Sequence, residues 1–70
     1  MIQVLFLQDF NLEGLIGHGW SAYYETVASF KIGDKAIVYH QNGFDWIEKG
    51  GEKFSTYFLY LLENKIIRLS

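Results

Sequence analysis

The sequence predicts a small, mainly β fold, and three observations lead to this prediction. Asn42-Gly43 lies between two apolar runs and is the strongest short signal for a hairpin, because both residues tolerate a positive φ. Residues 20–31 alternate between more apolar and more polar positions, as a half-buried strand does. Residues 1–7 form a near-continuous apolar run, which is typical of a strand covered on both sides. We expect a small barrel or a strongly twisted antiparallel sheet.

The segments that follow the first strand are less clear. Residues 8–19 are expected to be a loop with one helical turn at 11–16, since three glycines within it permit tight turns. Residues 20–31 can be a strand, with Trp20 and Phe30 on one face. They can also be a helix that Ser21 caps and a glycine ends. We favour the strand.

The middle of the chain is the best-defined part. Gly33-Asp34 forms a turn that leads into a strand at 35–41, and Asn42-Gly43 then reverses the chain into a second strand at 44–48. Residues 49–52 are polar and rich in glycine, so they form a flexible turn. This hairpin is the firmest structural prediction that the sequence allows.

Residues 53–63 again permit two interpretations. Their apolar residues recur at the spacing of one helical face, which would make the fold α+β. The apolar runs on either side of residues 63–65 also look like a hairpin with Asn64 at its bend. We favour the hairpin, and no proline interrupts either structure.

The composition indicates one small domain, residues 1–70, with more apolar surface than it can bury. Half of the residues are hydrophobic and 19% are aromatic, whereas a chain of this size buries only about 60% of its unfolded surface. Large exposed apolar patches usually mark contacts. We therefore expect a larger protein, a second copy of the chain as a homodimer, or both as partners.

Charge and cysteine content restrict the classes of partner and the compartment. The net charge is −2, and residues 1–30 contain no lysine or arginine, so no basic stripe is available for nucleic-acid phosphates. The absence of cysteine excludes disulfides and thiolate metal sites and favours the cytoplasm. We see no signal peptide and no apolar run of about 20 residues, so we expect no membrane contact.

One segment suggests a structural family. The pattern Phe30-x-Ile32-Gly33-Asp34-Lys35-Ala36-Ile37-Val38, followed by Gly43-Phe44-Asp45-Trp46-Ile47, resembles small Src-homology-3-like barrels of the Tudor and KOW type. The resemblance covers residues 30–69 and implies a barrel whose closing strands lie within 57–69. It would place a Tudor-like aromatic cage at Tyr39, Phe44 and Trp46. The basic loops of a KOW-like RNA site are missing from this chain.

No arrangement of residues points to catalysis or to a cofactor. His18 and His40 lack the close spacing of paired metal ligands. Residues 14–19 have the order G-x-x-G-x-G, which differs from a dinucleotide-binding loop and fits turn glycines better. We therefore expect no enzyme activity, no catalytic residue, no metal and no cofactor, and a small metal-dependent or histidine-dependent enzyme is the least favoured class.

The aromatic residues that flank the turns are the candidate binding surface. Tyrosine and tryptophan tolerate a half-exposed position and often anchor interfaces. We expect a non-enzymatic protein-binding domain that inhibits or modulates a larger protein, of a kind that viruses and mobile elements encode. The alternative is a barrel that stacks nucleic-acid bases on its aromatic side chains. The predicted partner-binding residues are Trp20, Tyr23, Tyr24, Phe44, Asp45 and Trp46.

Overall fold

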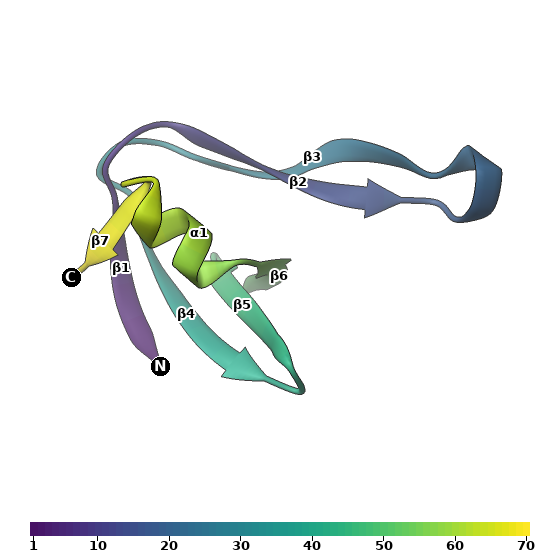
Figure 1. Cartoon of the computed structure of the whole chain (residues 1–70). Coiled ribbons are helices and arrows are strands. Elements are labelled where there is room, and N and C mark those ends of the chain that lie inside the picture. The colour runs from purple at the N-terminus through teal and green to yellow at the C-terminus, as the bar shows by residue number, and fades with distance from the viewer.

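A computed structural model describes residues 1–70 and confirms a mainly β fold (Figure 1). No helix is long and apolar enough to cross a membrane. The elements in chain order are β1 (Ile2–Phe6), β2 (Phe10–Ile16), a 3-10 turn (Gly19–Ser21), β3 (Tyr23–Phe30), β4 (Lys35–Gln41), β5 (Phe44–Lys49), β6 (Glu52–Thr56), α1 (Phe58–Glu63) and β7 (Ile67–Leu69).

Five strands form an open antiparallel sheet in the order β6-β5-β4-β1-β7. The outermost strands β6 and β7 do not pair with each other, so the sheet does not close into a barrel. Asn42 and Gly43 have φ values of 55° and 81°, which confirms the predicted hairpin between β4 and β5. The likeness to Src-homology-3-like barrels stays a prediction.

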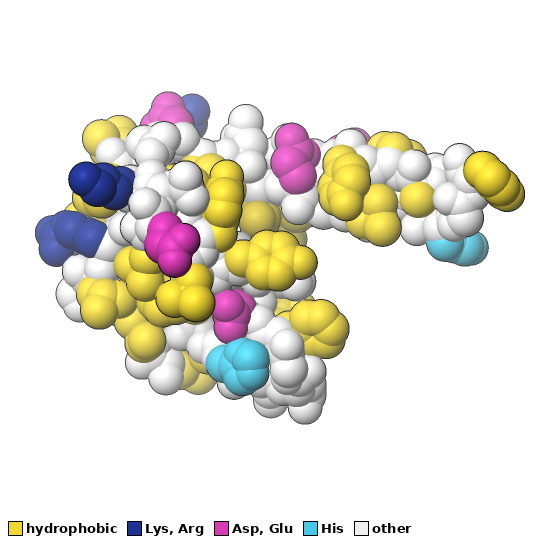
Figure 2. All heavy atoms as spheres, viewed as in Figure 1, with side chains coloured by type: hydrophobic (Ala, Val, Ile, Leu, Met, Phe, Trp, Pro, Cys, Tyr) yellow, Lys and Arg dark blue, Asp and Glu magenta, His cyan; other side chains and the backbone are white.

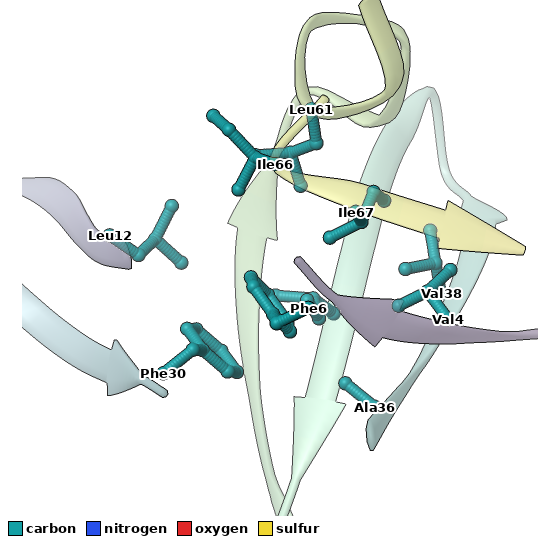
Figure 3. Packing of buried hydrophobic residues seen from close by; sticks show 10 residues of the cluster. Val4, Phe6, Leu12, Phe30, Ala36, Val38, Leu61, Ile66 and Ile67 are labelled. Atoms are coloured by element: carbon teal, nitrogen blue, oxygen red, sulfur yellow. The ribbon is translucent and has the colours of Figure 1, made fainter. Parts of the chain in front are cut away.

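One face of this sheet carries the core. The register pairs Val4 with Ala36 and Val38 with Ile47, and residues directly opposite each other in a sheet share a face. Leu61 of α1 packs onto the same cluster and is almost fully buried (Figure 3). The N-terminal strand β1 is therefore covered on one face, and not on both, because Gln3 on the other face remains exposed.

Strands β2 and β3 pair only with each other and form a projecting two-stranded ribbon, which we call the arm (Figure 1). The pairing runs from Phe10–Phe30 at the root to Ile16–Tyr23 near the far end. The molecule measures 40 × 26 × 25 Å, and its radius of gyration of 12.4 Å exceeds the value of about 11 Å for a compact chain of this length. The arm accounts for this elongation.

The arm is attached to the sheet by three phenylalanines, Phe6, Phe10 and Phe30, which we call the phenylalanine joint. The Phe6 and Phe30 rings stack with centroids 4.3 Å apart, and Phe6 and Phe10 stack at 6.3 Å. Figure 3 shows Phe6 from β1 beside Phe30 from β3. The Phe6 N–H also donates to the Asp34 carbonyl oxygen at 2.8 Å. The joint thus fixes the direction of the arm.

Charged groups surround the same joint. The Lys49 ammonium donates to the Asp34 carboxylate at 2.7 Å and lies 5.1 Å from the centre of the Phe30 ring. The Lys31 N–H donates to the same carboxylate at 2.9 Å. The bond from Lys49, followed by the bond from Lys31, holds the pKa of Asp34 below its usual value. These contacts join Lys49 of β5 to Phe30 and Asp34 at the root of the arm.

The structure overturns the loop predicted at 8–19 and the helix considered at 21–31. Residues 10–16 form β2, and residues 23–30 form β3 as favoured. Gly14 lies inside β2, where a Cβ atom would come within 2.8 Å of a Val27 methyl carbon. This glycine makes room for a neighbouring side chain and does not break the strand.

The hairpin predicted at 53–63 with Asn64 at its bend is wrong. The segment divides into β6 and α1, because pairing with β5 extends the first residues and the apolar spacing makes the rest helical. Asn64 ends the helix, and its side-chain amide donates to the Tyr60 carbonyl oxygen at 2.9 Å. Lys65 follows with a φ of 56° and turns the chain into β7.

We predict that Phe6→Ala lowers the free energy of unfolding by about 3–5 kcal/mol, because it removes a buried ring that also supports the arm. Chains of this length have a total stability of only about 4–10 kcal/mol. Urea denaturation followed by circular dichroism measures the change. Leu59→Ala is the control, and since Leu59 is exposed it should change stability by no more than about 0.5 kcal/mol. A similar small change for Phe6→Ala would contradict the role of the joint.

Candidate functional site

The far end of the arm, residues 17–22, presents a tryptophan to solvent, and we call it the tip. Gly17 and Gly19 have φ values of 80° and 65°, which glycine adopts without strain. The Ser21 hydroxyl donates to the His18 carbonyl oxygen at 3.1 Å and closes the turn. The relative exposure of Trp20 is 106%, so its whole side chain lies in solvent. Figure 2 shows a hydrophobic side chain at this end of the arm.

Both faces of the arm carry exposed apolar side chains next to the tip. The register pairs Leu15 with Tyr24 on one face and Ile16 with Tyr23 on the other, since successive side chains in a strand alternate. Tyr24 is 74% exposed and Leu15 is 59% exposed. The other strands and the helix lie at the root of the ribbon, away from this end (Figure 1). A partner that enclosed the arm would find an apolar surface on either side.

The arm also carries a negative charge. Glu13 and Glu25 lie on its two strands, and it contains no lysine or arginine. The Thr26 hydroxyl donates to the Glu13 carboxylate at 3.4 Å, and neither glutamate forms an ion pair. The combination is an apolar end with acidic side chains closer to the root.

The predicted residues Phe44 and Trp46 lie elsewhere, on the outer face of the sheet. Their rings meet edge to face with centroids 6.2 Å apart, and the Lys53 ammonium lies 4.9 Å from the Trp46 ring centre. Tyr39 pairs with Trp46 across β4 and β5. Partial burial, followed by the nearby Glu48 carboxylate, raises the pKa of the Tyr39 phenol. These residues form a second aromatic cluster, separate from the arm.

Asp45 points to the opposite face from Phe44 and Trp46 and has a structural role. One carboxylate oxygen lies 2.9 Å from Nδ1 of His40, and the other accepts a bond of 3.0 Å from the Phe58 N–H. Tyr57, which precedes α1, provides no side-chain cap, so Asp45 caps this helix from a distant strand. The bond to His40, followed by the bond to Phe58, holds the pKa of Asp45 below its usual value.

The six predicted site residues therefore fall into three positions. Trp20, Tyr23 and Tyr24 all lie near the end of the arm, with Tyr23 and Tyr24 on opposite faces, and Phe44 and Trp46 form the cluster on the sheet. Asp45 faces the core side and holds α1 in place. His18 lies at the tip and His40 at the β4–β5 hairpin, and no group of three or more potential metal ligands occurs.

A cleft of about 370 Å³ lies where the root of the arm meets β6 and α1. The sequence gives no signal for this cleft, because its two walls are more than 40 residues apart in the chain. Tyr57 belongs to the helical apolar pattern of the sequence and Tyr60 does not, yet both are exposed beside the cleft. The lining residues are Phe10, Asn11, Leu12, Glu13, Ser55, Thr56, Tyr57, Tyr60 and Leu61.

We predict that Asp45→Asn destabilises the chain at neutral pH and removes part of its acid sensitivity. A carboxylate whose folded-state pKa is lowered stabilises the fold above its ordinary value of 3.8, and this contribution is lost as the pH falls through the lower folded-state value. The difference in free energy of unfolding between wild type and Asp45→Asn should shrink between about pH 5 and pH 2. Urea denaturation at several pH values tests this, with Glu52→Gln as the control. A difference that does not change with pH would contradict it.

Comparison with known proteins identifies no relative. No protein-family model matches the sequence, and neither a curated protein nor a solved structure matches it. A function for the chain must therefore be inferred from its own residues and geometry.

Proposed function

We propose that the chain is a non-enzymatic protein-binding domain that inhibits or modulates a larger protein by inserting its arm into a groove of that protein. The observation that carries this proposal is the fully exposed Trp20 at the end of a ribbon with apolar side chains on both faces. The arm projects from the five-stranded sheet, so a partner can reach its end (Figure 1).

The energetics of the arm support an interface there. A two-stranded ribbon is only marginally stable by itself in water, so an arm of this kind gains from being covered. Tryptophan and tyrosine bury a large area on association while few rotatable bonds are fixed, and they dominate the energetic centres of interfaces. Trp20, Tyr23 and Tyr24 provide three such side chains within five residues.

The charge of the arm indicates the chemistry of the groove. Glu13 and Glu25 would lie at the rim of an interface centred on the tip. Charges at a rim steer association and select partners more than they add to affinity. We therefore expect basic side chains around the groove of the larger protein, and binding that weakens as salt is added.

The second aromatic cluster supports one other candidate function, the binding of single-stranded nucleic acid. Tyr39, Phe44 and Trp46 lie on one face of the sheet beside Lys53, as a base-stacking surface requires. Two features place this candidate second. Lys49 is engaged by Asp34, and Glu48 lies beside Tyr39.

We predict that Trp20→Ala reduces capture of the larger partner at least about tenfold, because it removes the central anchor of the interface. Immobilised wild type and variant are incubated with lysate of the native host, and the captured proteins are compared by quantitative mass spectrometry. Leu59→Ala is the control, since Leu59 is also an exposed apolar residue and lies outside the arm. Equal capture by Trp20→Ala and wild type would contradict the proposal.

We predict no retention of single-stranded or duplex oligonucleotides at low salt, because the chain has a net charge of −2 and no basic stripe. Fluorescence anisotropy with labelled oligonucleotides measures this. Binding that weakens with salt and is lost in Trp46→Ala would instead favour the second candidate.

A further inference from the structure

We propose that the cleft between the arm root, β6 and α1 receives the Trp20 tip of a second copy of the chain, and that the two copies do this reciprocally in a two-fold dimer. The inference rests on the proposed function insofar as it takes the arm to be a docking element. It goes further by naming the occupant of the cleft. The dimer covers the exposed end of each arm while the larger partner is absent.

The exposed area of the single chain is the first argument. The chain exposes 5118 Å², whereas a compact monomer of 8.2 kDa exposes about 4,500 Å². The excess is about 600 Å² per chain, or about 1,200 Å² for two chains. Specific protein interfaces begin at about this total area. Covering the arm and the cleft would bring each copy to the exposure of an ordinary folded protein.

The cleft has the size and chemistry to hold the tip. Its volume of about 370 Å³ is at the lower end of the range for sites that enclose a small molecule, which suits an aromatic side chain. Phe10, Leu12 and Tyr60 provide apolar walls, while Asn11 and Glu13 provide oxygen atoms. A buried indole N–H needs such an acceptor. The Trp20 side chain makes no hydrogen bond within its own chain, so its N–H is free to donate.

The positions of the tip and the cleft allow both contacts to form at once. The tip lies at one end of the arm, and the cleft lies at the other end, beside Phe10–Glu13 of β2. When two arms of equal length lie antiparallel, each tip reaches the root of the other arm. A two-fold axis between them then makes the two contacts identical, which closes the assembly. The open space beneath the arm in Figures 1 and 2 is the side from which the second arm would approach.

The charges agree with insertion of the tip and predict a response to salt. The tip contains no acidic side chain, so nothing in it repels Glu13 at the cleft. The remainder of each arm carries Glu13 and Glu25 and no basic residue, so two antiparallel arms repel each other. Added salt screens this repulsion and should strengthen the dimer. A larger partner with a basic groove would show the opposite response.

Sedimentation equilibrium of the purified chain over a range of concentrations tests the dimer. We expect a reversible monomer–dimer equilibrium in which Trp20→Ala and, separately, Tyr60→Arg each raise the dissociation constant at least about tenfold. Tyr60→Arg places a charge in the cleft from an exposed helical position. Leu59→Arg is its matched control, because Leu59 is the neighbouring exposed residue and does not line the cleft. It should leave the dissociation constant within about twofold of wild type.

Mixing the two variants gives the sharper result. Trp20→Ala keeps an intact cleft and Tyr60→Arg keeps an intact tip, so a heterodimer of the two retains one complete contact. We expect the mixture to dimerise more tightly than either variant alone. In a Trp46→Phe background, Trp20 is the only tryptophan, and its emission should move to shorter wavelength as the concentration rises. Circular dichroism establishes that each variant is folded.

The proposal is overturned by a chain that remains monomeric at millimolar concentration. It is also overturned by a dimer that Trp20→Ala and Tyr60→Arg leave intact, or by a mixture that gains nothing over the separate variants. These failures differ from failure of the proposed function. If the chain does not dimerise but still captures a larger protein in a Trp20-dependent way, only the dimer proposal fails. If the chain forms a dimer that depends on Trp20 but its capture of a larger protein does not, only the proposed function fails.

Discussion

The stacking of Phe6 on Phe30 is the contact on which the rest of the structure depends. It connects β1 of the five-stranded sheet to β3 of the ribbon, and both rings are almost fully buried. A two-stranded ribbon has no core of its own, so its order comes from what holds its root. The Asp34–Lys49 pair surrounds the same place and ties β5 to the turn that leaves the arm. A change at this joint would act on the core and on the orientation of the arm together.

Sequence reasoning worked where local chemistry decides the structure. The Asn42-Gly43 hairpin follows from the backbone preferences of two residues, and β3 follows from the alternation of side chains. It failed where contacts with residues far away in the sequence decide the structure. The sequence predicts Gly14 in a loop, whereas it pairs with Glu25 inside β2, and the nearby Val27 side chain leaves no room for a Cβ atom there. Residues 58–63 are predicted to be extended but form α1, whose first N–H, that of Phe58, donates to the Asp45 carboxylate of β5.

In the candidate site, too, local features are predictable from the sequence and contacts between distant segments are not. Residue types and neighbouring glycines single out the aromatic side chains at 20, 23 and 24, and each of the three is exposed near the end of the arm, with Tyr23 and Tyr24 on opposite faces. Asp45 is predicted to bind a partner with them, yet it caps α1 from strand β5, a contact that only the folded chain creates. The sequence does not indicate the cleft, because its walls, which include Leu12 and Tyr60, belong to different elements far apart in the chain. Exposure of single residues is thus easier to anticipate than convergence of several.

The irregular pairing of β2 and β3 has a consequence for how such an arm persists in a crowded solution. Both long edges of the ribbon carry unpaired backbone groups, which is the usual starting point for fibrous aggregation. The register shifts between Leu12 and Glu13, and a shift of this kind twists the ribbon and interrupts the regular spacing that a growing stack of strands requires. Glu13 and Glu25 on adjacent strands add repulsion to any such stack. The arm can therefore keep an exposed apolar end for binding while its edges resist polymerisation.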